Sequence, residues 1–284
     1  MFNRKTEGSV VCPSCGSLVG VRDEKCYSCG RSNPGLWGFA PAIRALGRDM
    51  GFVPLVIGAS VILYGLALAA SGGDIMGGGV FSILAPSLRA QIWFGASGAI
   101  PVFILGYWWT LLSAGWLHGG LLHILFNMMW VRDLGPVVVD LVGPGRTVII
   151  YVISGVAGFL LSSTAGAYIG PVPLMGGGGG FTVGASASIF GLLGAMVHYG
   201  RKSGSSLIRG EAARYAIILF VMGLLIRGVD NWAHAGGFLG GYATSMFFNP
   251  LTRERGDHVV VAMLLLIATF AAIAVSLLQG PPRF

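Results

Sequence analysis

Long apolar runs, separated by short charged segments, constrain this chain more than any other feature of its sequence. Only 10% of its 284 residues are charged, whereas a soluble domain carries about 25%. We therefore expect lipid to surround most of the chain. The sequence predicts an all-α polytopic membrane protein. Seven runs are long enough to be considered as spans, at about 52–70, 115–131, 147–165, 184–200, 215–226, 231–248 and 259–278.

Two parts of this pattern need interpretation. The fifth run is short, but Arg214 and Arg227 flank it, and their side chains can extend to the membrane surfaces so that the run spans. The stretch 79–106 is interrupted by Pro86, Arg89, Pro101 and several glycines. We expect it to form a long, partly membrane-embedded loop rather than an eighth span.

The positions of the Lys and Arg residues predict the orientation. If the N-terminus is cytoplasmic, 15 of the 18 basic residues fall in inner segments and three, Arg89, Arg227 and Arg283, in outer ones. This excess favours a cytoplasmic N-terminus and seven spans. The net charge of +7 could suggest nucleic-acid binding. Because the charges lie in short clusters between apolar runs, we expect no nucleic-acid partner.

All four cysteines lie near the N-terminus, in two Cys-x-x-Cys pairs: Cys12, Cys15, Cys26 and Cys29. Two such pairs can place four thiolates around one Zn²⁺, and a segment with so few apolar residues needs metal to fold. Two disulfides or free thiols are the alternatives. Because four cysteines leave no open coordination position, the predicted zinc would be structural or would serve a cytosolic partner of this head, and no cofactor is expected for catalysis.

These features predict four parts of the chain. A zinc-ribbon-like head occupies 1–32 and a linker follows at 33–51. Trp37 and Phe39 in this linker could lie at the membrane interface, and a plain linker is an equal alternative. A membrane core of six helices covers 52–248, and a loop with the seventh helix covers 249–284.

Polar side chains inside a membrane are costly, so each suggests a function. Three of the predicted spans carry them, and all three run from outside to inside in the predicted topology, so the polar residues fall at similar depth near the outer surface. They are His118, His123 and Asn127 in the second span, Ser186 and Ser188 at the start of the fourth, and His234 at the start of the sixth.

Helix periodicity suggests which of these residues meet. On the sixth span, Gly237 and Gly241 share the face of His234 and allow another helix to approach closely. Gly191 belongs to a stripe of small residues beside Ser186 on the fourth span. Packing of the two stripes would bring Ser186 Oγ within hydrogen-bond reach of His234, as a nucleophile and its base.

The second span supplies candidates for stabilising a developing oxyanion. His123 and Asn127 are four residues apart and therefore share a helix face. They, together with the backbone N–H of Ser186, are suitable donors. His118 is out of phase with Asn127, and we expect it to stabilise the neighbouring loop. Asp230 precedes His234 at the edge of a loop and receives no triad role, so the sequence predicts a dyad.

Two other serines compete with Ser186. Ser97 also follows Gly-Ala, but Pro101 comes soon after it, and neither a helix start nor a glycine stripe supports it. Ser188 points about 200° away from Ser186 around the same helix. We therefore expect Ser186 to be the nucleophile.

The segments "HGGLLHILFN", "GASASIFGLLGA" and "AHAGGFLGG", in this order on alternate spans, resemble the rhomboid intramembrane serine proteases. The resemblance covers about 52–248. It implies a six-helix core with Ser186 as nucleophile and His234 as base, His123 and Asn127 at the oxyanion site, and Phe190 packed on the imidazole. It also implies cleavage of transmembrane segments of membrane proteins near their outer end, with the seventh helix as an addition.

Two positions depart from the family pattern. Ala187 stands where the family has glycine after the nucleophile, and Trp109-Thr110 stands where it usually has Trp-Arg in the loop before the second span. The alternative function is a catalytically silent relative that binds membrane clients. A transporter would need charged residues near the middle of the bilayer, which the predicted spans lack. The cysteine-rich head on such a protease fits the inner membrane of a bacterium.

Overall fold

The computed structural model describes residues 4–13, 15–41, 47–72, 83–176 and 180–282. The chain divides into two compact units, Met1–Phe52 and Val53–Phe284.

The N-terminal unit is built on one β-hairpin. β1 (Ser9–Val11) and β2 (Leu18–Gly20) pair antiparallel, and a short helical turn, η1 (Leu36–Gly38), follows. The core of the unit is small and contains two of the cysteines: Val10, Cys12, Val19, Val21, Cys26 and Ala40. Leu36 packs against this core, so the head continues into the segment 33–51 that we expected to be a linker.

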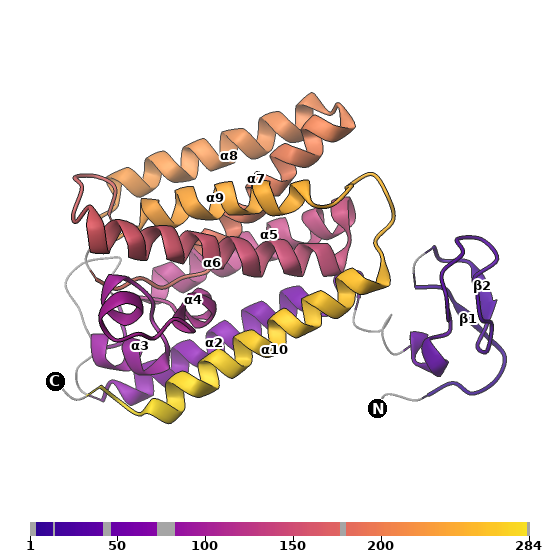
Figure 1. The fold of residues 1–284 in the computed structure, drawn as a ribbon, viewed down its shortest axis with the longest axis horizontal. Helices are drawn as coiled ribbons and strands as arrows, with labels where there is room; N and C mark the ends of the chain where they lie inside the picture. Colours follow the sequence, from indigo (N-terminus) through magenta and orange to yellow (C-terminus); the bar gives the residue numbers. More distant parts are fainter. Residues whose placement is uncertain (1–3, 14, 42–46, 73–82, 177–179, 283–284) are drawn as a thin grey trace. The chain divides into compact units, whose positions relative to one another are not determined.

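The second unit is helical (Figure 1). Seven long helices correspond to the seven predicted spans: α2 (Phe52–Ala70), α5 (Leu121–Val142), α6 (Pro144–Tyr168), α7 (Ser186–Ser203), α8 (Ser206–Leu225), α9 (Asn231–Met246) and α10 (Gly256–Gln279). Shorter helical elements lie between α2 and α5: α3 (Leu88–Phe94), η3 (Ile100–Ile104), α4 (Thr110–Ser113) and η4 (Ala114–Trp116). The described part of 79–106 is therefore a connection with short helices of its own rather than a span.

Two predicted spans had wrong boundaries. The second was expected at 115–131, but α5 runs from Leu121 to Val142. It begins later because the chain is still extended at Gly120, so His118 lies before the helix. The fifth span was expected from 215, but α8 begins at Ser206. Ser205 caps that earlier start by accepting a hydrogen bond from the backbone N–H of Ile208 at 3.3 Å.

Helices α7 and α9 pack closely on each other, and both pack on α6. Most residues of α7 are buried on every side of the helix, so α7 meets other helices rather than lipid. This explains why α7 can carry glycine, serine and histidine. Figure 1 shows α9 running between α8 and α6 in the view.

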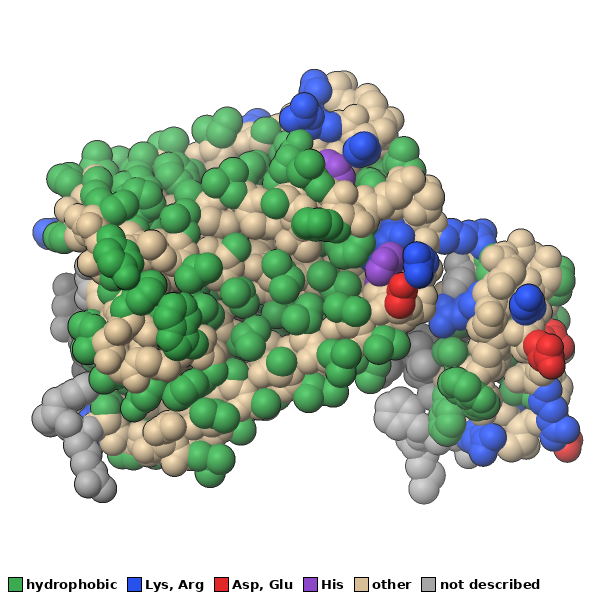
Figure 2. Space-filling view, viewed as in Figure 1, with side chains coloured by type: hydrophobic (Ala, Val, Ile, Leu, Met, Phe, Trp, Pro, Cys, Tyr) green, Lys and Arg blue, Asp and Glu red, His purple; other side chains and the backbone are tan. Residues whose placement is uncertain are grey.

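Four of the described helices, α2, α5, α6 and α10, are long and apolar enough to cross a membrane by length and composition alone. The face of the helical unit seen in Figure 2 is covered largely by hydrophobic side chains. Lys and Arg side chains gather near one end of that face, around the turn between α7 and α8 and the loop before α10. An apolar belt with charges at an end is the distribution expected of a protein embedded in a bilayer.

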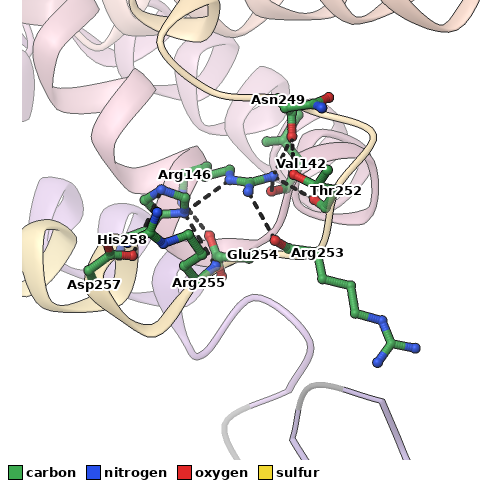
Figure 3. Close-up of polar contacts among 9 residues, drawn as sticks. All are labelled: Val142, Arg146, Asn249, Thr252, Arg253, Glu254, Arg255, Asp257 and His258. Carbon is green, nitrogen blue, oxygen red and sulfur yellow. Dashed lines mark hydrogen bonds and ion pairs between the residues drawn. The ribbon is translucent and has the colours of Figure 1, made fainter. Parts of the chain in front are cut away.

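Arg146, at the start of α6, joins this helix to the loop before α10 (Figure 3). Its side chain is 2% exposed, and its own backbone N–H donates to Glu254 Oε1 at 2.6 Å. The guanidinium donates to five acceptors: the carbonyls of Val142, Asn249, Thr252 and Arg253, and Nδ1 of His258. Because a buried guanidinium requires such partners, this cluster fixes the N-terminal end of α10. Neither Arg146 nor this cluster was predicted from the sequence.

Two further histidines lie near helix ends. His198 is buried in α7 with its ring 5.6 Å from that of Tyr242, and His258 belongs to the Arg146 cluster. The glycine run 176–180 lies largely outside the described residues.

Candidate active site and cysteine cluster

Ser186 and His234 lie on neighbouring helices with their side chains together. Ser186 is the first residue of α7, and His234 lies in the first turn of α9. Ser186 Oγ is 2.9 Å from His234 Nε2. His234 is 6% exposed, whereas Ser186 is half-buried. A hydroxyl at this distance from an imidazole can transfer its proton to the ring as it attacks a carbonyl carbon.

Asn231 orients the imidazole. Its Oδ1 lies 3.1 Å from Nδ1 of His234 and, because a carboxamide oxygen is only an acceptor, Nδ1 carries the proton in this contact. Nε2 is then free to accept from Ser186. Asn231 is completely buried, and sequence reasoning missed it. Its spacing of three residues from His234 on one helix was the available signal.

Two further contacts hold the ring and the start of its helix. Phe190, one turn after Ser186, stacks on His234 with ring centroids 4.3 Å apart and 17° between the planes. Asp230 caps α9 by accepting from the backbone N–H of Ala233 at 3.0 Å, and Ser162 on α6 donates to the other carboxylate oxygen. Asp230 therefore stabilises the helix start, and the contact at Nδ1 belongs to Asn231.

Glycines allow α7 and α9 to approach each other at the site. A Cβ atom on Gly237 would lie 2.1 Å from the carbonyl oxygen of Ala187, and one on Gly241 would lie 2.1 Å from that of Gly191. Gly191 also faces α6, since a Cβ there would lie 1.9 Å from Ser154 Oγ. No side chain fits at these positions without moving a helix.

His123, one of the predicted oxyanion donors, lies beside the chain that leads into α7. The backbone N–H of Gly119 donates to His123 Nδ1 at 3.1 Å, so the proton of a neutral ring is on Nε2. That nitrogen faces Gly184, where a Cβ would lie 2.6 Å from it. Asn127 donates through Nδ2 to the carbonyl of His123 at 2.8 Å. His118 is 2% exposed, and its ring lies 5.2 Å from that of His123.

The two competing serines have other surroundings. Ser97 is completely buried and pairs through its backbone with Thr182, at 3.1 and 2.7 Å. A helical turn does follow it at Ile100, contrary to our expectation. Ser188 is 3% exposed and faces α6, where a Cβ on Gly155 would lie 2.6 Å from its Oγ.

Comparison with known proteins identifies the family. The model of the Rhomboid domain matches residues 105–251, which include Ser186, His234 and the residues that contact them. The chain belongs to the rhomboid family. Together with its apolar helices, this makes it an integral membrane protein.

Individual rhomboid relatives are similar over about half of the chain. The Rhomboid protease GluP of Bacillus subtilis is 30% identical over 165 residues, which are 57% of this chain and 30% of that protein. RHOMBOID-like protein 1 of Arabidopsis thaliana is 29% identical over 201 residues, 61% of this chain and 49% of the relative. The Inactive RHOMBOID-like protein 8 of the same plant is 31% identical over 153 residues, 51% and 40% of the two chains. The chain thus spans less than half the length of these curated relatives.

The head of this rhomboid protein holds its four cysteines together. Their Sγ atoms all lie within 4.8 Å of one another, with 3.8 Å between Cys12 and Cys29 and 3.6 Å between Cys15 and Cys26. A tetrahedral Zn²⁺ with bonds of about 2.3 Å separates its sulfurs by about 3.8 Å, whereas a disulfide joins sulfurs about 2.05 Å apart. All four are free cysteines, so the cluster could bind a metal.

Two of the thiols differ in acidity. Hydrogen bonds from Ser17 lower the pKa of Cys15 to about 5, which favours the thiolate that a metal requires. Burial raises the pKa of Cys29 to about 11. Binding of a metal to the cluster would therefore release at least the Cys29 proton.

Proposed function

We propose that this chain is an intramembrane serine endopeptidase that cleaves transmembrane segments of membrane proteins near their outer end. The observation that carries the proposal is the 2.9 Å contact between Ser186 Oγ and His234 Nε2, in a chain of the rhomboid family. The tautomer that Asn231 imposes on His234 makes Nε2 the proton acceptor that a nucleophilic serine needs.

In the proposed reaction, Ser186 Oγ attacks the carbonyl carbon of the substrate while its proton passes to His234 Nε2. The negative charge that develops on the carbonyl oxygen is stabilised by Nε2–H of His123, the amide of Asn127 and the backbone N–H of Ser186. The first N–H groups of a helix have no acceptor within that helix. His234 then protonates the leaving amine, and water hydrolyses the ester on Ser186 with His234 again as base.

We propose a cytoplasmic N-terminus and a site near the outer surface of the membrane. The 15 basic residues in the predicted inner segments, against three in the outer ones, support this orientation. Ser186 and His234 both lie at the starts of their helices, which run from outside to inside in that topology. The inner membrane of a bacterium is our assignment of the compartment.

The second candidate is a catalytically silent protein that binds membrane clients. One observation favours it: a relative called inactive is 31% identical, as similar as the relative called a protease. The serine and histidine are both present here and within hydrogen-bond distance, which favours the enzyme.

For the head we propose one structural Zn²⁺ bound by Cys12, Cys15, Cys26 and Cys29. The sulfur separations support this metal, and a core as small as that of the head folds with the help of metal binding. Elemental analysis of the purified full chain should find about one zinc per protein, falling below half of that in Cys12→Ser. Full zinc content in that variant would contradict the proposal.

A fluorescent phosphonate that labels active serines tests the function. The protein would be purified and reconstituted in liposomes, and the parent compared with Ser186→Ala, His234→Ala and Ser97→Ala. Labelling should occur in the parent and in Ser97→Ala and disappear in the other two. A folded parent that neither labels nor cleaves a model transmembrane substrate would favour the silent client-binding protein.

A further inference from the structure

The C-terminal half of α10 holds the loop that precedes α5 through two tryptophans. Trp109 Nε1 donates to Ser276 Oγ at 3.0 Å, and Trp93 Nε1 donates to the carbonyl of Leu277 at 3.0 Å. Ser276 is 4% exposed and itself donates to the carbonyl of Ala272 at 3.1 Å. Its hydroxyl is therefore used both as donor within α10 and as acceptor from the loop.

Packing reinforces these hydrogen bonds. The ring of Trp116, 2% exposed, lies 5.3 Å from that of Phe270 on α10. Gly95 has a φ of 103°, and a Cβ there would lie 2.7 Å from Ser276 Oγ and 2.3 Å from Ser113 Oγ. Ser113 in turn donates to the carbonyl of Gly95 at 2.7 Å. The loop backbone thus lies directly on the α10 hydroxyl.

The same loop also holds the segment that leads into Ser186. Ser97 and Thr182 exchange two backbone hydrogen bonds, and the backbone N–H of Gly184 donates to the carbonyl of Ala114 at 3.0 Å. Ala114 is completely buried. These contacts fix the backbone at Thr182 and Gly184, four and two residues before Ser186. The His123 ring lies against Gly184.

We infer that α10 is a positioning element for the candidate active site, and that Trp109 and Ser276 form the hydrogen bond that couples the two. Residues 93–116 transmit this support from α10 to residues 182–186. The inference rests on the proposed function, since it concerns the geometry around Ser186. Trp109 and Ser276 touch neither Ser186 nor His234 in the contacts described, so they are positioning residues.

Helix α10 is suited to position the loop because its N-terminal end is also held in place. The Arg146 cluster ties the loop before α10 and His258 in its first turn to the start of α6 (Figure 3). Helix α10 also packs along α6, α4 and α3. A helix held at both ends can support a connection that contains only short helices.

The sequence departure at Trp109-Thr110 agrees with this arrangement. Thr110 Oγ1 donates to the carbonyl of Tyr107 at 2.7 Å and lies 3.4 Å from Ser97 Oγ. It therefore makes contacts inside the loop, whereas the neighbouring Trp109 reaches outside it to α10. The contact of Trp109 therefore joins the loop to a helix that lies outside residues 105–251, the part that matches the Rhomboid domain.

The test compares Ser276→Ala with Thr269→Val in the full chain in liposomes. Thr269 is on the same helix, is equally buried at 1% exposure, and donates only to the carbonyl of Leu265 within α10. Both variants lose one intrahelical hydrogen bond, but only Ser276→Ala loses the acceptor of Trp109. The measurements are phosphonate labelling, kcat and KM on a model transmembrane substrate, melting temperature, and hydrogen exchange of residues 93–116 and 182–185.

We expect Ser276→Ala to lower kcat and the labelling rate roughly fivefold, the effect of about one net hydrogen bond, with KM unchanged. Thr269→Val should stay within about twofold of the parent. Trp109→Phe should match Ser276→Ala, and the double variant should be no slower than either, because both remove one contact. Exchange of 182–185 should quicken in Ser276→Ala and not in Thr269→Val.

Equal exchange of 182–185 in Ser276→Ala and Thr269→Val would overturn the inference. So would equal losses of activity that follow the melting temperature in both variants, because these would indicate general destabilisation. If the folded parent neither labels nor cleaves the model substrate, the proposed function fails, and the exchange measurement still decides whether α10 positions the segment before Ser186.

Discussion

The chain contains two similar short segments, Gly95-Ala96-Ser97 and Gly184-Ala185-Ser186, with different surroundings. In both, the glycine has a positive φ, 103° and 129°. Ser97 is completely buried and its backbone pairs with Thr182. Ser186 is half-buried at the start of an 18-residue helix, with an imidazole nitrogen 2.9 Å from its hydroxyl.

The difference between the two segments lies in what packs against them. α9 approaches the second segment because Gly237 and Gly241 leave room for α7. The first segment lies instead against Ser113 and against Ser276 on α10, which bring hydroxyl groups but no base. The local sequence places each serine two residues after a glycine of positive φ. The helix that packs against the segment then determines which chemistry the serine can perform.

The largest effect should come from removing the candidate nucleophile. Ser186→Ala should lower cleavage of a transmembrane substrate by about 10³-fold or more, because no other group supplies the attacking oxygen. His234→Ala should be similar, and the double variant no slower than the singles, since the two residues act together. Initial rates in liposomes measure this. If a Ser186→Ala protein with an unchanged melting temperature still cleaved substantially, Ser186 would not differ from Ser97 as a nucleophile.

The second-largest effect should come from a substitution that separates α7 from α9. In Gly237→Val the side chain would begin 2.1 Å from the carbonyl oxygen of Ala187, so the helices must part and Ser186 must leave His234. We expect destabilisation of about 1–3 kcal/mol or more, measured by thermal unfolding, and a large loss of phosphonate labelling of the folded protein. Gly210→Ala on α8 is the control, because a Cβ there meets nothing within 4 Å. Comparable losses in the two variants would mean that close packing at Gly237 is unimportant.

Features with a local or periodic signal could be predicted from the sequence. The apolar runs predicted the long helices, because burial in lipid demands them. The glycines that share the face of His234 predicted close packing of α7 and α9, which the structure has. The paired cysteines likewise indicated the cluster that the head forms.

Features that depend on distant partners could not be predicted. Trp109 and Ser276 are 167 positions apart, and nothing near either residue indicates the other. Arg146 looked like an ordinary basic residue of an inner loop, yet it is buried because carbonyls more than 100 positions away surround it. The start of α5 was missed for a different reason: the residues from Trp116 to Gly120 fit an apolar run, while the backbone at Gly120 is extended.

The second segment, which contains Ser186, also differs from the first in that Asn231 orients its base, His234. Asn231→Ala would remove the acceptor at His234 Nδ1, so the ring could hold its proton on either nitrogen. We expect kcat to fall on the order of tenfold or more with KM unchanged. Ser162→Ala is the matched control, since Ser162 contacts Asp230 and not the imidazole, and it should lie within about threefold of the parent. A kcat for Asn231→Ala as high as that of Ser162→Ala would show that the ring needs no such support.

The smallest effect should come from Ser97→Ala, the counterpart of the first substitution. Ser97 joins Thr182 through backbone groups, which alanine keeps, and its hydroxyl lies 3.4 Å from Thr110 Oγ1, whose shorter hydrogen bond goes to Tyr107. We expect a loss of stability of about 1 kcal/mol or less and labelling within about threefold of the parent. If Ser97→Ala lost labelling while Ser186→Ala kept it, the nucleophile would lie in the first segment. The helix packing that distinguishes the second segment would then have another purpose.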